Sequence, residues 1–263
     1  MSQTINLVDG LLRAARHLQA NGQSQPAHDL LQRLSNFRNL PADVAEEVHL
    51  RLADLHAERE DFKTARRHLT VALTHAPERG DYHHRMACWI EDDADTSMNR
   101  AGRYYRQAVQ CEPDNADYWA DYGEYLIDGG RTEAGVKALR RASRLAEHDP
   151  ELIGRVAASL READRWDEAR TLVRSAMFHN SQDRRFRTLW QQHQFARLRE
   201  EQHTRAEPAT KAAGGPRLLP FLRKKSPARQ VVDGKIIRFD AAATDTIPLP
   251  KDRRKTPRNR GAK

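Results

Sequence analysis

The chain has 263 residues, of which 31% are charged and 38% hydrophobic, and its formal net charge is +8. No apolar run approaches about 18 residues, which argues against a membrane-spanning helix. The N-terminus has no basic segment followed by an apolar core, as a secretory signal would. Two cysteines, Cys88 and Cys111, are too few for a disulfide framework. We therefore expect a helix-rich cytoplasmic protein.

The first two units of a repeated helix-pair pattern cover residues 8–41 and 46–79. In each unit, apolar or packing residues at helical spacing form two stripes with a polar break between them. The first unit has Leu11, Ala14, Ala15 and Leu18, then Ala27, Leu31 and Leu34. The second has His49, Leu52, Ala53 and His56, then Phe62, Ala65, Leu69 and Ala72. We interpret His49 and His56 as packing residues.

The next two units cover residues 80–115 and 116–149. The third has His83, Met86, Ala87 and Ile90, then Ala101, Tyr105 and Ala108. Two extra residues between Glu91 and Asn99 predict a bulge in its turn. The fourth has Trp119, Tyr122, Gly123 and Leu126, then Gly135, Leu139 and Ala142. Between its stripes, Asp128-Gly129-Gly130 predicts a helix break, and its small residues predict a close approach of two helices.

The fifth unit covers residues 150–183, and a capping helix follows at 184–204. The unit has Ile153, Val156, Ala157 and Leu160, then Trp166, Ala169, Val173 and Ala176. Because a stack of repeats ends on an apolar face, its last unit needs a cover with a polar outer side. The capping helix offers Phe186, Leu189, Trp190, His193 and Leu198 roughly along one side.

The remaining residues, 205–263, have a different composition. They hold 16 Lys and Arg against 5 Asp and Glu, a net charge of +11, which leaves residues 1–204 at −3. They also contain 7 of the 12 prolines. Such a segment cannot bury enough apolar surface to offset its ordering entropy, so we predict a disordered basic tail. Within it, Asp233-Gly234 favours a β-hairpin over residues 230–239.

The repeat of 34 to 36 residues resembles the tetratricopeptide repeat (TPR) family. Trp119, Gly123, Gly135, Leu139 and Ala142 fit the family's pattern, as do Ala65, Leu69, Ala72 and Pro77. The resemblance covers about two thirds of the chain. It implies an all-α, right-handed superhelical solenoid of antiparallel helix pairs, in which the first helix of each pair lines a concave face. It also implies a non-catalytic scaffold that binds proteins or peptides.

The first helices supply the candidate groove residues. Helical steps from the packing stripes select 25 positions, of which 12 are acidic and two are Arg, whereas the second helices are rich in Arg. Helix-end preferences and ordinary solvated faces account for part of this bias. The predicted partner-binding residues are Asp9, Leu12, Glu47, Leu50, Asp54, Glu58, Asp81, Glu91, Asp92, Asp117, Glu124, Ile127, Asp128 and Glu151. This acidic groove predicts a basic or amphipathic partner segment, selected by apolar contacts and steered by charge.

The chain's own basic tail is one such segment, and we expect it to reach the groove. An alternative function is nucleic-acid association through the tail and the basic second helices, since clustered Lys and Arg displace counterions from phosphates. We expect no enzyme, because the sequence has no phosphate loop, nucleophile elbow or paired-carboxylate setting. His84 and Cys88 lie one helical turn apart, but no second close pair completes a metal-ligand pattern. We therefore predict no catalytic residues, no metal and no cofactor.

Overall fold

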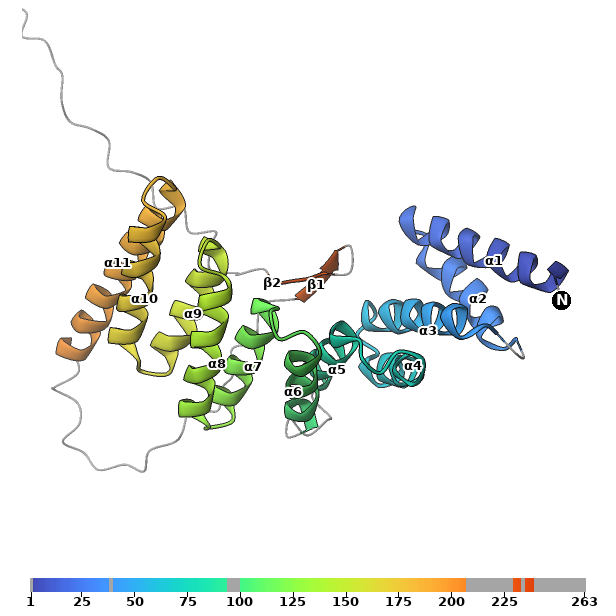
Figure 1. Ribbon diagram of the computed structural model, residues 1–263, viewed down its shortest axis with the longest axis horizontal. Helices are drawn as coiled ribbons and strands as arrows, with labels where there is room; N and C mark the ends of the chain where they lie inside the picture. The colour runs from blue at the N-terminus through green and yellow to red at the C-terminus, as the bar shows by residue number, and fades with distance from the viewer. Residues whose placement is uncertain (1, 38–39, 94–99, 207–228, 233–234, 239–263) are drawn as a thin grey trace, which may run out of the picture. The chain divides into compact units, whose positions relative to one another are not determined.

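The computed structural model describes residues 2–37, 40–93, 100–206, 229–232 and 235–238 (Figure 1). Contacts divide the chain into two units, residues 1–206 and 207–263. The described residues of the first unit form helices joined by short turns, and those of the second form two strands. The helices are α1 (Ser2–Ala20), α2 (Ser24–Ser35), α3 (Ala42–Ala57), α4 (Phe62–His75), α5 (Gly80–Asp92), α6 (Ala101–Cys111), α7 (Ala116–Asp128), α8 (Thr132–Leu145), α9 (Pro150–Glu162), α10 (Trp166–His179) and α11 (Arg184–Ala206).

Each helix packs chiefly on its neighbours in sequence, as the succession of helix pairs in Figure 1 illustrates. The tightest pairs are α1 with α2, α3 with α4, α5 with α6, α7 with α8 and α9 with α10. α9 also contacts α7 and α11, so odd-numbered helices meet across successive pairs. This arrangement confirms the predicted all-helical solenoid for the first unit.

A recurring turn ends the first helix of four of the described pairs. In each turn one residue has a left-handed backbone: Gly22 (φ 72°), Glu60 (φ 60°), Gly130 (φ 74°) and Asp164 (φ 60°). The next residue's amide donates back to a carbonyl five residues earlier, for example from Arg131 to Leu126 at 2.8 Å. This is the Schellman arrangement, which satisfies carbonyls at a helix end. At helix starts, the side chains of Asp61, Asn115 and Asp149 accept hydrogen bonds from backbone amides and cap α4, α7 and α9, respectively.

The core confirms most of the predicted stripes, but it corrects the one in α1. Val8, Leu12 and Ala15 are buried there, whereas Ala14 is exposed. Leu12 packs in a cluster with residues of α2 and α3, including Leu31 and Val48. Because Leu11 and Leu12 are adjacent, the helical period fits either register. The packing of α1 against α2 and α3 selects the register that buries Leu12.

α11 covers the end of the stack with only part of its predicted stripe. Phe186 and His193 are buried, and Leu189 and Trp190 pack against α9 and α10 residues. Leu198 is 52% exposed, and the neighbouring Phe195 is 63% exposed. The apolar contact of α11 with α9 and α10 therefore lies in the first half of α11.

In the second unit, β1 (Arg229–Val232) and β2 (Lys235–Arg238) pair antiparallel. Val232 is opposite Lys235, so two residues separate the strands, as the predicted hairpin around Asp233-Gly234 requires. The turn itself lies outside the described residues. The predicted disorder of residues 205–263 and the predicted bulge between Glu91 and Asn99 also fall mainly on residues outside the described ones.

Candidate functional site

Ion pairs connect successive odd-numbered helices on the side where the groove was predicted. Arg16 of α1 donates to Glu47 of α3, with Nε at 2.7 Å from Oε1. Arg85 of α5 donates to Asp54 of α3, with Nη1 at 2.5 Å from Oδ1. Each pair joins residues 31 positions apart. We call this side, formed by polar residues of α1, α3, α5, α7 and α9, the odd-helix face.

Arg155 of α9 extends this pattern to α7. Its guanidinium lies 3.4 Å from Glu124, 3.6 Å from Asp117 and 3.6 Å from Asp121. Ser159 also donates to Glu124 at 3.0 Å. One arginine therefore faces three carboxylates of the preceding first helix. Much of the acidic character predicted for the groove is thus balanced within the protein.

The structure places the predicted groove residues in different surroundings. Exposed residues are Asp9, Glu58, Asp92, Asp117, Asp128 and Glu151. Partly buried residues are Glu47, Leu50, Asp54, Asp81, Glu91, Glu124 and Ile127. Leu12, which was also predicted to bind a partner, is 4% exposed and packs in the core, so in this structure its side chain is not open to a partner. Arg155 brings Asp117 and Glu124 together, and Ile127 lies against the core formed by α7 to α10.

The pKa values of the paired carboxylates depend on which effect is larger. Burial raises the pKa of Glu47, but hydrogen bonds from Arg16 and Arg51 outweigh it and lower the pKa overall. At Asp54, burial outweighs the attraction of Arg85 and raises the pKa. Burial and the Asp54 charge together raise the pKa of Glu58. The face thus holds carboxylates with opposite tendencies to take up a proton.

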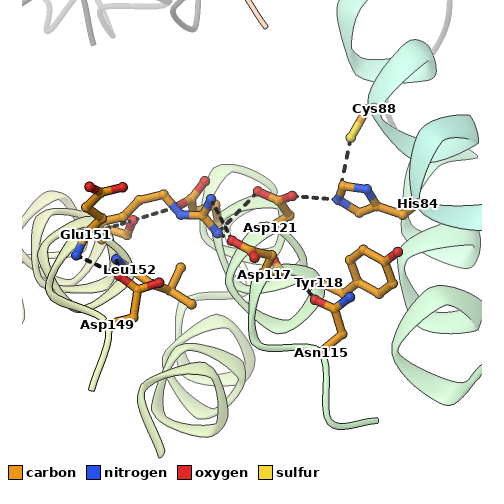
Figure 2. Close-up of polar contacts among 12 residues, drawn as sticks. His84, Cys88, Asn115, Asp117, Tyr118, Asp121, Asp149, Glu151 and Leu152 are labelled. Carbon is orange, nitrogen blue, oxygen red and sulfur yellow. Dashed lines mark hydrogen bonds and ion pairs between the residues drawn. The ribbon is translucent and has the colours of Figure 1, made fainter. Parts of the chain in front are cut away.

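A buried polar cluster joins α5 to α7 behind this face. His84 Nε2 lies 2.5 Å from Asp121 Oδ2 and 3.7 Å from Cys88 Sγ, and the Tyr118 ring stacks on the imidazole at 4.5 Å. Figure 2 shows His84 between Cys88 and Asp121. Burial lowers the pKa of His84, but Cys88 and Asp121 outweigh it and raise the pKa to about 10.

Sequence reasoning noticed His84 with Cys88 but missed Asp121, which is 37 positions away. The ion pairs between odd-numbered helices could have been found from the sequence, because oppositely charged residues recur there at a separation of 31 positions. Asp121 does not follow that separation in its contact with His84. It could be found only from the way α7 packs on α5.

Charge is divided between the two helices of each pair. The odd-numbered helices α1 to α9 contain 14 Asp and Glu against 6 Arg, a net charge of −8. The even-numbered helices α2 to α10 contain 4 Asp and Glu against 12 Lys and Arg, a net charge of +8. Arg16, Arg51, Arg85 and Arg155, which form ion pairs on the odd-numbered helices, are included in these totals; Arg79, which pairs with Glu46 and Asp81, lies between α4 and α5 and would reduce the acidic excess by only one. An acidic excess therefore remains on the odd-numbered helices after internal pairing.

Four histidines form a row across α2, α3 and α4. The ring of His56 is 5.2 Å from His28 and 5.5 Å from His68, which in turn is 5.2 Å from His49. The Nδ1 atoms of His49 and His68 are 2.9 Å apart, so one ring must donate and the other accept. If both rings were protonated, neither could accept. The four histidines therefore form a continuous row of imidazole rings that connects α2, α3 and α4.

Acid should weaken the fold through this row. Burial and the neighbouring histidines lower the pKa of His68 to about 4, and burial lowers the pKa values of His49 and His56. Asp61 opposes these shifts, whereas Arg59 and His75 reinforce them. Because the unfolded chain takes up protons near pH 6.5, stability is full above that pH and falls toward pH 4. We expect a loss of about 1 kcal/mol between pH 7 and pH 5, after discounting for partial exposure.

Urea unfolding at both pH values measures this loss. His68→Gln should flatten the pH dependence, whereas His179→Gln, at an exposed position of α10, should leave it unchanged. An equal pH dependence in wild type and His68→Gln would contradict the prediction.

No described helix is both long and apolar enough to cross a membrane. Sequence comparison adds no assignment, since no protein-family model and no curated protein matches the chain.

Solved structures do match. The MamA RS-1 double mutant superposes with a TM-score of 0.56 at 15% identity, covering 67% of this chain and 96% of that one. YrrB, described as a TPR protein with an unusual peptide-binding site, has a TM-score of 0.50 at 12% identity and covers 67% and 88%. The C-terminal part of a TPR repeat-containing protein from Cytophaga hutchinsonii has a TM-score of 0.52 at 13% identity and covers 64% of each chain. The chain therefore has the TPR fold, which confirms the sequence resemblance.

Proposed function

We propose that this protein is a non-catalytic interaction scaffold whose odd-helix face binds a basic or amphipathic peptide segment. One observation carries the proposal: the odd-numbered helices have a net charge of −8 and the even-numbered helices +8. Stacked helix pairs present such charge as an extended surface, which suits a chain segment better than a small molecule. The excess remains although Arg16, Arg85 and Arg155 pair with acids of the same face.

We assign the charge on this face two roles. Asp54 and Glu124 are partly buried and hold neighbouring helices together through Arg85 and Arg155. Asp117, Asp128 and Glu151 are exposed and can meet a partner, although Asp117 also lies 3.6 Å from Arg155. Long-range attraction would raise the association rate, while the partly buried Leu50 and Ile127 offer apolar contact. The description of YrrB supports peptide binding as a use of this fold.

The protein's own tail is the first candidate segment. Residues 205–263 carry a net charge of +11, opposite to that of the odd-numbered helices. Because the tail is covalently attached, its effective concentration at the face is on the order of mM or below. The tail then competes with an external basic segment, and a partner must displace it.

Selection of random displayed peptides on the full chain tests the proposal. We expect the selected peptides to combine Lys or Arg with apolar residues. Their binding should weaken about tenfold in the triple variant Asp117→Asn, Asp128→Asn, Glu151→Gln. A tenfold loss corresponds to charge contacts worth about 1.4 kcal/mol. The matched control is Glu133→Gln, Glu147→Gln, Asp167→Asn, which removes the same charge from exposed positions on or next to even-numbered helices. Equal loss of binding in both variants, or selection of acidic peptides, would contradict the proposal.

Nucleic-acid association is the second candidate, and the net charge of +8 on the even-numbered helices favours it. The test is to use the protein to capture partners from a cell extract, with and without nuclease treatment. Capture that requires nucleic acid and falls steeply with salt would favour this function over peptide binding.

A further inference from the structure

We infer that His84, Cys88 and Asp121 form a binding site for a divalent transition metal of the zinc type, which connects α5 to α7. Each residue offers one ligand atom, and these atoms all lie within 4.8 Å of one another. All three residues are buried. The exposed residues Asp117, Asp128 and Glu151 of the proposed peptide-binding surface are not part of this buried site, and the inference does not depend on the proposed function.

The three donors suit zinc by chemical type. Imidazole nitrogen, thiolate sulfur and carboxylate oxygen are the ligands that Zn²⁺ takes in proteins. Zinc lies about 2.3 Å from sulfur and about 2.0 Å from nitrogen, which places two such ligands about 3.5 Å apart in tetrahedral geometry. His84 Nε2 and Cys88 Sγ are 3.7 Å apart. A shared metal would therefore need little movement of these two side chains, which lie one turn apart on α5.

Asp121 supplies the third donor from another helix. Its Oδ2 lies 2.5 Å from His84 Nε2, a hydrogen-bond distance that a metal would widen by about 1 Å to reach tetrahedral spacing. Its other oxygen, Oδ1, lies 3.6 Å from Arg155 of α9, so Oδ2 is turned toward His84. The Tyr118 ring stacks on His84 and limits rotation of the imidazole. Such surrounding contacts orient metal ligands before the metal arrives.

Charge balance also favours a divalent cation. Metal binding would displace the proton of the His84 imidazolium and the proton of the Cys88 thiol to solvent. The Cys88 thiolate and the Asp121 carboxylate then carry two negative charges, and the neutral His84 adds none. One divalent metal ion brings the sum at the site to zero, which matters because an unbalanced buried charge is strongly unfavourable. The Tyr105 hydroxyl lies 3.6 Å from Cys88 Sγ and is a nearby oxygen for the fourth position, which a water molecule can also fill.

Titration of the reduced, metal-free full chain with Co²⁺ tests the site. We expect one equivalent to give thiolate-to-cobalt charge-transfer absorption, and we expect Zn²⁺ to displace the cobalt and to raise the midpoint of thermal unfolding. Cys88→Ser should abolish the charge-transfer band. Cys111→Ser is the matched control, because Cys111 is exposed and outside the cluster, and it should keep the band.

Asp121→Asn provides a second variant that conserves size, and it should weaken cobalt affinity at least about tenfold while circular dichroism shows unchanged helix content. This variant decides the question if Cys88→Ser does not fold. Absence of the band in the full chain, its survival in Cys88→Ser, or unchanged affinity in a folded Asp121→Asn would overturn the site and leave a cluster held only by hydrogen bonds.

Discussion

Gly135→Ala is expected to destabilise the helix stack by about 2 kcal/mol. Gly135 lies where α8 meets α7, and a Cβ there would be 2.6 Å from Ile127 Cγ1 and 2.7 Å from the Gly123 carbonyl oxygen. A carbonyl of a neighbouring helix cannot rotate away as a side chain can. The two helices must therefore separate or shift, which loosens the contacts among Leu139, Ala142 and their neighbours.

Alanine substitutions at two other glycines distinguish the steric effect at Gly135 from the helix propensity of alanine. Gly10→Ala adds its methyl group in α1 where nothing lies within 4 Å, so it should stabilise the protein by about 0.5–1 kcal/mol. At Gly123, a new Cβ would lie 2.8 Å from Leu139 Cγ and 3.0 Å from the Gly135 carbonyl oxygen. Because the backbone atom is farther away here than the 2.7 Å found at Gly135, Gly123→Ala should cost less than Gly135→Ala. Urea unfolding followed by circular dichroism measures all three changes. A Gly135→Ala variant as stable as wild type would show that the contact between α7 and α8 is not tight.

Arg85→Met should cost about 3 kcal/mol at neutral pH. Arg85 is 6% exposed and donates to Asp54, whose side chain is 24% exposed. Met fills a similar volume but leaves the Asp54 carboxylate partly buried beside an apolar side chain. Since burial already raises the pKa of Asp54 with Arg85 present, loss of the cation makes the charged form still less favourable.

A double-mutant cycle assigns that loss to the ion pair. Asp54→Asn combined with Arg85→Met should be less destabilised than the sum of the single variants, because neither charge then remains unbalanced. Arg140→Met is the surface comparison: Arg140 is 58% exposed and pairs with Glu168, so its loss should cost about 0–1 kcal/mol. Strict additivity of the two changes in the cycle would contradict a coupled pair.

The sequence by itself determined the helix pairs and their order. Apolar residues spaced for one helical face, followed by turn residues such as Gly129-Gly130, are local signals that do not depend on the rest of the chain. The close approach of α7 and α8 at Gly123 and Gly135 was predictable for the same reason, since small residues are a local feature of the sequence. The strand pair that flanks residues 233–234 was also predictable, because an Asp-Gly turn prescribes the register of its flanking strands.

Only the tertiary structure decided which side chains meet across successive pairs. In α1, Leu11 and Leu12 fit the helical period equally well, and packing with α2 and α3 buried Leu12. The sequence predicted an acidic groove, whereas the structure shows that Arg85 and Arg155 neutralise part of the acidic residues on this face. The contact of His84 with Asp121 depends on the angle and offset at which α7 packs on α5. That offset is set by the sum of many core contacts, so a single repeat contains no local signal for it.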